Sequence, residues 1–164
     1  MSHSIAGARG VVKDRDAVLR QAQAWAAAQD SEVLLADASV VFGRDHLESA
    51  ALHAERARDA KRMATRSVSM EALLYLAAQR QVADAIRIAG IKDGTEAVAL
   101  ILFGAASVDD LVAMLGWARD DAVLEPDKKS LRILGLSRTA ERTVAPERAT
   151  ELALEKTALV DLDK

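Results

Sequence analysis

Apolar residues recur at helical spacing along most of the chain, and this pattern predicts a largely helical protein. Between these stretches the period is lost or a turn residue such as Gly90 ends the pattern. Asp16, Ser67 or Ser69, and Ser107 are the candidate N-caps, because their side chains can accept a hydrogen bond from the first helical turn. The pattern predicts helices over about 14–28, 44–62, 69–78, 80–89 and 107–115, a short helix within 127–135, and a terminal helix that begins near Pro146.

Two apolar runs have the length of buried strands rather than helices. Residues 33–35 form a short run beside a bend, and residues 97–103 form seven consecutive apolar positions. A run of that length is typical of a strand buried on both faces, so we place 97–103 in the centre of a sheet. Shorter extended pieces are expected at 10–12 and 40–42, and an acidic loop is expected over 120–127.

Three or four strand-like pieces among six or seven helices predict an α+β fold with a small mixed or antiparallel sheet. An α/β arrangement is the alternative, and a pure helical bundle fits the pattern less well. At 164 residues and 17.6 kDa, the chain is expected to form a single compact domain over 1–164. Its composition is 51% hydrophobic but only 3% aromatic, which predicts a core built mainly from Ala, Leu, Val and Ile.

Composition also excludes several classes of chemistry. The chain has no cysteine, which rules out disulfides, thiolate metal sites and cysteine nucleophiles. No apolar stretch reaches the ~20 residues that span a bilayer, and no secretory signal is seen, so we expect a soluble, cytoplasmic protein without a membrane partner. The net charge of −3 excludes a whole-surface field that attracts nucleic acid, so RNA binding would need a local basic patch.

The sequence carries no recognisable catalytic motif. It has no Gly-rich phosphate loop and no G-x-S-x-G nucleophile turn. His46 and His53 stand seven residues apart on one predicted helix, roughly 10 Å along its axis, and cannot share a metal ion. We therefore expect no catalytic residue, no cofactor and no metal. A small enzyme that uses His46 or His53 stays as an alternative.

Charge is unevenly distributed in one segment, residues 55–66. Five basic residues there outnumber two acidic ones, which gives a local charge of +3 in an acidic chain. Cations at the C-terminal end of a helix also stabilise its dipole, so charge alone fits either a solvated helix end or a phosphate-binding surface. The basic residues are Arg56, Arg58, Lys61, Arg62 and Arg66, and the acidic ones are Glu55 and Asp59.

Three linked motifs lie in the middle of the chain. They are V-x-G-x-x-H-L-x-x-A at 41–50, E-x-L-L-Y at 71–75 and R-Q-V-x-x-A-I-x-x-x-G-I at 80–91. Over residues 41–104 the sequence resembles the kinase-binding, tRNA-recruiting subunit of the KEOPS complex, the family that includes the PRPK-binding protein TPRKB. One departure is that Ala77 and Ala78 stand where this family often has a Ser-Gly pair.

The resemblance implies a non-catalytic α+β subunit of a heteromeric complex. Such a subunit binds and activates the small atypical kinase/ATPase of KEOPS, and it recruits tRNA through the 3′ CCA end for threonylcarbamoyl-adenosine modification. A protein-only regulatory scaffold that does not touch RNA is the alternative. The resemblance implies tRNA contacts at Lys61, Arg62, Arg66, Arg80 and Gln81.

The kinase-binding surface is harder to place, because a helix face that buries a partner has the same pattern as one that faces the core. We place it on the terminal helix, around Leu152 and Leu159. The helical period predicts an inward face of Ala149, Leu152, Ala153, Lys156, Leu159 and Val160 for that helix.

Overall fold

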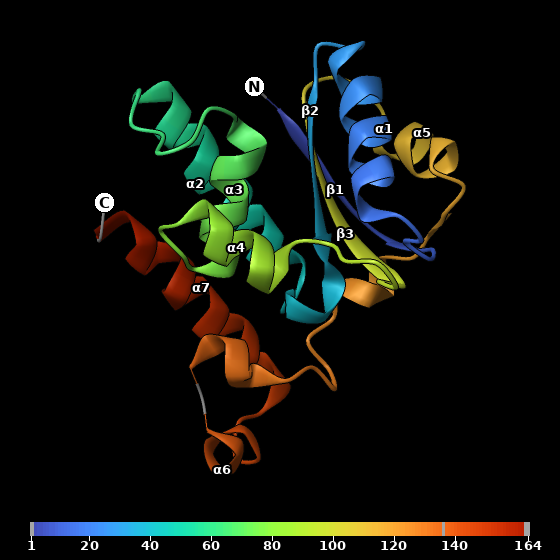
Figure 1. Cartoon of the computed structure of the whole chain (residues 1–164). Helices are drawn as coiled ribbons and strands as arrows, with labels where there is room; N and C mark the ends of the chain where they lie inside the picture. The colour runs from blue at the N-terminus through green and yellow to red at the C-terminus, as the bar shows by residue number, and fades with distance from the viewer. Residues whose placement is uncertain (1, 136, 163–164) are drawn as a thin grey trace.

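The computed structural model describes residues 2–135 and 137–162 and shows an antiparallel sheet covered by helices on both faces (Figure 1). The strand order is β2-β3-β1-β4, so β2 and β4 form the two edges. β4 is only two residues long. The strands are β1 (His3–Arg9), β2 (Glu32–Asp37), β3 (Ala97–Phe103) and β4 (Ala118–Arg119).

Within the described ranges the chain forms seven α-helices, six of them in two layers and α6 apart from both, next to residues 131–134. α1 and α5 cover one face of the sheet, and α2, α3, α4 and α7 lie on the other side (Figure 1). The expected α+β class with an antiparallel sheet is therefore confirmed. The helices are α1 (Arg15–Ala27), α2 (Arg44–Asp59), α3 (Val68–Ala77), α4 (Val82–Ala89), α5 (Val108–Met114), α6 (Arg138–Glu141) and α7 (Pro146–Leu162), and short 3-10 turns are η1 (Ala38–Val40), η2 (Asp121–Leu124) and η3 (Leu131–Leu134).

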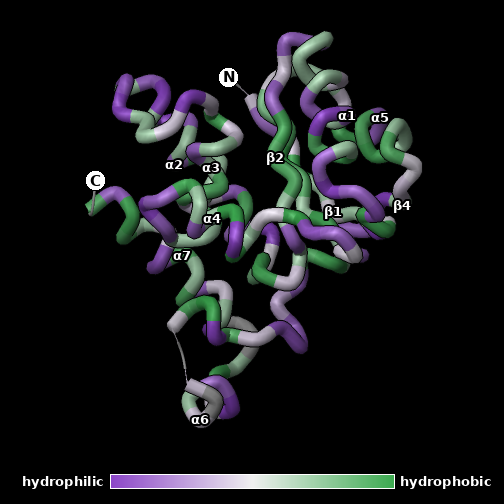
Figure 2. The backbone as a smooth tube through the Cα atoms, in the orientation of Figure 1, coloured by the Kyte–Doolittle hydropathy of each residue, from purple (hydrophilic) through white to green (hydrophobic). Residues whose placement is uncertain are grey.

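Strand β3 lies inside the sheet, as its apolar run predicts. It pairs with β1 over its full length on one side and with β2 over residues 98–103 on the other. Successive side chains point to opposite faces. Ile101 and Phe103 pack toward α2 and α3, whereas Leu100 and Leu102 pack toward α1 and α5. Figure 2 shows β2, beside it, as a largely hydrophobic segment between the two helical layers.

The first strand was misplaced by the sequence pattern. The strand lies before the extended piece expected at 10–12, since β1 ends at Arg9, and the Gly10 and Val12 N–H groups then donate to the carbonyl oxygens of Glu96 and Thr95 at 3.0 and 2.8 Å. The small residues of β1 give no strand signal, but they fit a crowded position: a Cβ on Gly7 would lie 2.6 Å from the Asp120 carbonyl oxygen. Pairing with β3 therefore fixes this strand, and local propensity does not.

Three smaller expectations differ from the structure, two of them because of a local polar side chain. The cap of α1 is Asp14 rather than Asp16, since its carboxylate accepts from the Ala17 N–H at 3.2 Å. The extended piece expected at 40–42 starts later, because the Asp37 carboxylate accepts from the Ser39 N–H at 2.9 Å and starts the turn η1, which includes Val40; Val41 is extended. The helix expected within 127–135 is reduced to the 3-10 turn η3. The caps at Ser67 and Ser107 are confirmed.

Candidate functional site

The turn after α2 carries a group of exposed cations. Helix α2 ends at Asp59, and Lys61 adopts a left-handed conformation (φ 55°) that turns the chain back toward α3. Lys61, Arg62 and Arg66 are exposed and form no ion pair within residues 2–135 and 137–162. Figure 2 shows this turn as strongly hydrophilic. We call Lys61, Arg62 and Arg66 the basic turn.

The acidic residues of the segment do not neutralise the basic turn. Glu55 accepts from His3 on β1 at 3.0 Å, so it is engaged on the sheet side of α2. Asp59 is bonded by Arg58 at 2.7 Å. The local positive charge read from the sequence is therefore kept by exposed side chains.

A buried carboxylate holds the basic turn in place. Glu71 is fully buried in α3, and its Oε2 accepts from the Ala64 N–H at 2.9 Å and the Thr65 N–H at 3.0 Å. The Thr65 hydroxyl donates to the same oxygen at 2.9 Å. The first residue of the E-x-L-L-Y motif thus organises the loop that presents the cations, a role not evident from its position in the first helical turn.

Arg80 and Gln81 lie beyond the other end of α3, where both are exposed. The ten-residue helix separates them from Arg66 by roughly 15 Å. The structure therefore brings Lys61, Arg62 and Arg66 together, and places Arg80 and Gln81 in a second group. A ligand that touches both groups has to run along α3.

Ala78 ends α3 in the left-handed region, with φ 52° and ψ 45°. Only glycine adopts this conformation without steric cost, which is about 1 kcal/mol for other residues. We expect Ala78→Gly to raise the free energy of unfolding by about 0.5–1 kcal/mol, to be measured by urea denaturation. Ala77→Gly, inside the helix, is the matched control and should lower it by a similar amount. An equal loss in both variants would contradict this explanation.

Three side chains from α2, α3 and α7 meet between the basic turn and Arg80. The Tyr75 hydroxyl on α3 donates to Asp161 on α7 at 2.5 Å, and the other carboxylate oxygen contacts His53 Nδ1 on α2 at 2.7 Å. The His53 and Tyr75 rings are stacked, with centroids 5.0 Å apart. Burial and the Asp161 carboxylate raise the pKa of Tyr75, so its hydroxyl stays protonated and donates.

The same three residues line a hollow of about 280 Å³ together with Arg56, Ala57 and Arg62. Arg56 is exposed and makes no ion pair in the described part of the chain. Among the described lining residues, Asp161 supplies the one carboxylate, and two guanidinium groups accompany it. The hollow therefore offers hydrogen-bond donors, positive charge and one acceptor in a small space. We call it the α2–α3–α7 hollow.

The other two histidines have structural roles. His46 is 2% exposed, and its Nδ1 accepts from the Phe42 N–H at 3.1 Å. Burial lowers its pKa to about 4, so the ring is neutral at pH 7 and closed to a substrate. His3 lies between Glu48 and Glu55, which raise its pKa against the opposing effect of burial. Across the described ranges, no group of three or more His, Cys, Asp or Glu residues is arranged to hold a metal ion.

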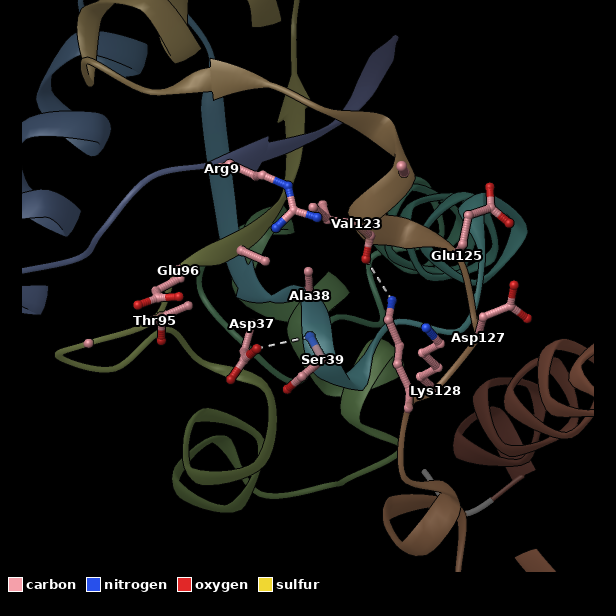
Figure 3. A pocket seen from close by; sticks show the side chains of 14 residues that line it. Arg9, Asp37, Ala38, Ser39, Thr95, Glu96, Val123, Glu125, Asp127 and Lys128 are labelled. Carbon is pink, nitrogen blue, oxygen red and sulfur yellow. Dashed lines mark hydrogen bonds between the residues drawn. The ribbon is translucent and has the colours of Figure 1, made fainter. Parts of the chain in front are cut away.

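A wider hollow of about 790 Å³ opens at the end of the sheet (Figure 3). Its basic residues, Arg9, Lys128 and Lys129, face Asp37 and Glu96 among other acidic side chains, so no single charge dominates. The Lys129 ammonium donates to the carbonyl oxygens of Val41 and Val123, at 2.5 and 2.7 Å. Burial lowers the pKa of Lys129 to about 8. These contacts give the lysine a structural role between η2 and the start of α2.

The terminal helix α7 differs in detail from its predicted face. Leu152 is half-buried and packs against the cluster around Phe42, whereas Leu159 is 47% exposed. Thr157 is fully buried instead, and its hydroxyl donates to the Tyr75 carbonyl oxygen at 3.2 Å. Leu159 and Leu162 therefore form the exposed apolar end of this helix. None of the helices in the described ranges has the length and hydrophobicity of a membrane span.

Comparison with known proteins adds two findings. The profile of a family described as "Kinase binding protein CGI-121" matches residues 11–133, three quarters of the chain. The chain is also 33% identical over 135 residues to the "Regulatory protein Cgi121" of Methanocaldococcus jannaschii, which covers 78% of this chain and 82% of the relative. The matched family region includes the basic turn and both ends of α3, and stops before α7.

Proposed function

This chain belongs to the CGI-121 family of kinase-binding proteins, and from that premise we propose that it is a regulatory, non-catalytic KEOPS subunit that also recruits tRNA. It binds and activates a small atypical kinase/ATPase, and it holds the 3′ CCA end of tRNA for threonylcarbamoyl-adenosine modification. Kinase binding follows from the family. The RNA contact is supported by the cations along α3.

The observation that carries the RNA contact is the basic turn, whose three exposed cations form no ion pair with the described residues. The basic turn lies at one end of α3, Arg80 and Gln81 lie at the other, and Glu71 holds the basic turn rigid. Lys and Arg side chains neutralise phosphates without reading sequence, and proteins commonly bind RNA at its single-stranded loops and ends. Slight sequence readout is enough, because every tRNA ends in the same three nucleotides.

The test compares binding of intact tRNA and the same tRNA without its 3′ CCA, at one fixed salt concentration. We expect removal of the CCA to abolish specific binding. Arg66→Glu and Arg80→Glu should each weaken binding of intact tRNA roughly tenfold, about 1.4 kcal/mol. Arg20→Glu, an exposed charge reversal on α1 across the sheet, should have little effect. Equal binding of both RNAs would refute tail recognition and favour the protein-only scaffold.

The kinase-docking surface is proposed on α7, at its exposed apolar end. Leu159 and Leu162 are 47% and 79% exposed, a degree of exposure that burial against a partner would relieve. Leu152 supports that surface from below by packing against the cluster around Phe42. Leu159→Glu separates the two surfaces when binding of the kinase is measured beside binding of tRNA. We expect this variant to lose kinase binding and to keep tRNA binding.

A further inference from the structure

The α2–α3–α7 hollow contains one feature that phosphate binding alone does not require, which is the carboxylate of Asp161. Arg56 and Arg62 suit a phosphate, but a carboxylate in the same small space repels one. Asp161 is also held firmly, since Tyr75 and His53 contact its two oxygens. The hollow is therefore built for a ligand with a negative part and a separate group that donates hydrogen bonds.

A terminal ribonucleotide has this combination of groups. Its 5′ phosphate is negative, and its free 2′ and 3′ hydroxyls are adjacent donors. A ribose hydroxyl donating to an Asp or Glu is a common way for proteins to bind nucleotides. Every internal nucleotide of an RNA lacks the free 3′ hydroxyl, because a phosphate occupies that position.

We infer that the α2–α3–α7 hollow binds the last ribose of an RNA and recognises its free 2′,3′-hydroxyl pair through Asp161. Arg56 and Arg62 hold the phosphate that precedes this ribose. This inference rests on the proposed tRNA function and adds to it a requirement on the chemical state of the RNA end.

The dimensions and accessibility of the hollow fit this ligand. About 280 Å³ is just below the roughly 300–1,000 Å³ of sites for larger ligands, so it suits a single sugar or nucleoside. The Asp161 side chain is 44% exposed, which lets a ligand reach it. Tyr75 lies between Arg66 and Arg80 along α3, so the hollow is next to the path proposed for the RNA tail.

The position of Asp161 on α7 also predicts which RNA ends are rejected. A 3′-phosphate would place its charge against the carboxylate, in a partly enclosed space where charges are weakly screened. On a purely basic surface the extra phosphate would instead strengthen binding. The two arrangements therefore give opposite results with the same RNA.

The experiment measures binding of short RNAs that end in CCA and differ only at the last ribose, at one salt concentration. The three ends are a free 2′,3′-diol, a 2′,3′-dideoxyribose and a 3′-phosphate. We expect the dideoxy end to bind about tenfold more weakly than the diol, and the 3′-phosphate end more weakly still. Asp161→Asn should bring the diol and 3′-phosphate ends within about twofold of each other, whereas Glu155→Gln on the same helix should keep the wild-type order.

Each outcome separates this inference from the proposed function. CCA-dependent binding that ignores the chemistry of the last ribose, or that is tighter for the 3′-phosphate, overturns the inference and leaves tRNA recruitment intact. Absence of binding to every RNA, at concentrations where the kinase still binds, overturns both. The wild-type series decides the question without any variant, so a folding defect in Asp161→Asn cannot obscure it.

Discussion

Glu71→Ala is expected to lower the free energy of unfolding by about 3 kcal/mol and to weaken binding of RNA ends. The substitution leaves the Ala64 and Thr65 N–H groups without their acceptor, whereas the Thr65 hydroxyl keeps the Ser67 carbonyl oxygen at 2.9 Å. A buried donor without a partner costs about 1–3 kcal/mol. RNA binding should fall with stability, because the same hydrogen bonds hold the basic turn beside α3.

The free energy of unfolding is measured by urea denaturation. RNA binding is measured at a temperature where the variant is folded. Glu155→Ala removes a carboxylate from an exposed position of α7 and should change neither quantity by more than about 0.5 kcal/mol. Glu71→Gln keeps one acceptor oxygen and should lie between wild type and Glu71→Ala. A stability loss without any loss of RNA binding would show that the turn does not present the cations.

The second large effect is expected on acidification, and its source is His46. Burial lowers the pKa of this ring to about 4 in the folded chain, against 6.5 in the unfolded chain. Between these values the unfolded state binds the proton and the folded state does not, so stability falls as the pH falls from about 6.5 to 4. The shift corresponds to a loss of about 3 kcal/mol, complete near pH 4 and absent above pH 7.

The measurement is the free energy of unfolding as a function of pH for wild type and His46→Gln. The variant has no titrating ring, so its stability should fall by about 3 kcal/mol less over the same interval. His3 acts in the opposite sense. Its raised pKa stabilises the fold below about pH 6.5 and loses that effect as the pH rises through the folded pKa. Parallel curves for wild type and His46→Gln would exclude the buried ring as the cause.

Elements whose own residues determine their burial were predictable from the sequence. The helices α2 and α3 form where their apolar residues predict them, and β3 follows its run of seven apolar residues. Helix α4 also forms where predicted, but Val82 and Ile86 of its apolar stripe are 36% and 38% exposed, and its buried residues are Ala85 and Ala89. The basic turn was predictable for the same reason, since its charge is local. The motif resemblance likewise identified the family that the comparisons show.

What the sequence did not predict depends on contacts between distant residues. β1 is a strand because it pairs with β3, almost a hundred residues later. The position of Glu71 predicts only a helix-terminus charge, because the groups that donate to its carboxylate lie in a loop whose path the sequence does not predict. Asp161 was not singled out at all. It becomes part of a site only when α7 packs on α2 and α3, and nothing in its local sequence signals that packing.

The position of β3 also affects how the protein aggregates. Its seven apolar residues have the length and composition of a segment that stacks into amyloid. Both of its edges are covered, by β1 and β2, and a hollow beside β2 is lined by Leu19 of α1 and Leu73 of α3. Helices that flank an edge strand keep a second chain from pairing with it. Aggregation through β3 therefore requires global unfolding first. The rate at which the protein aggregates in solution then depends on its unfolding rate and not on the protein concentration alone.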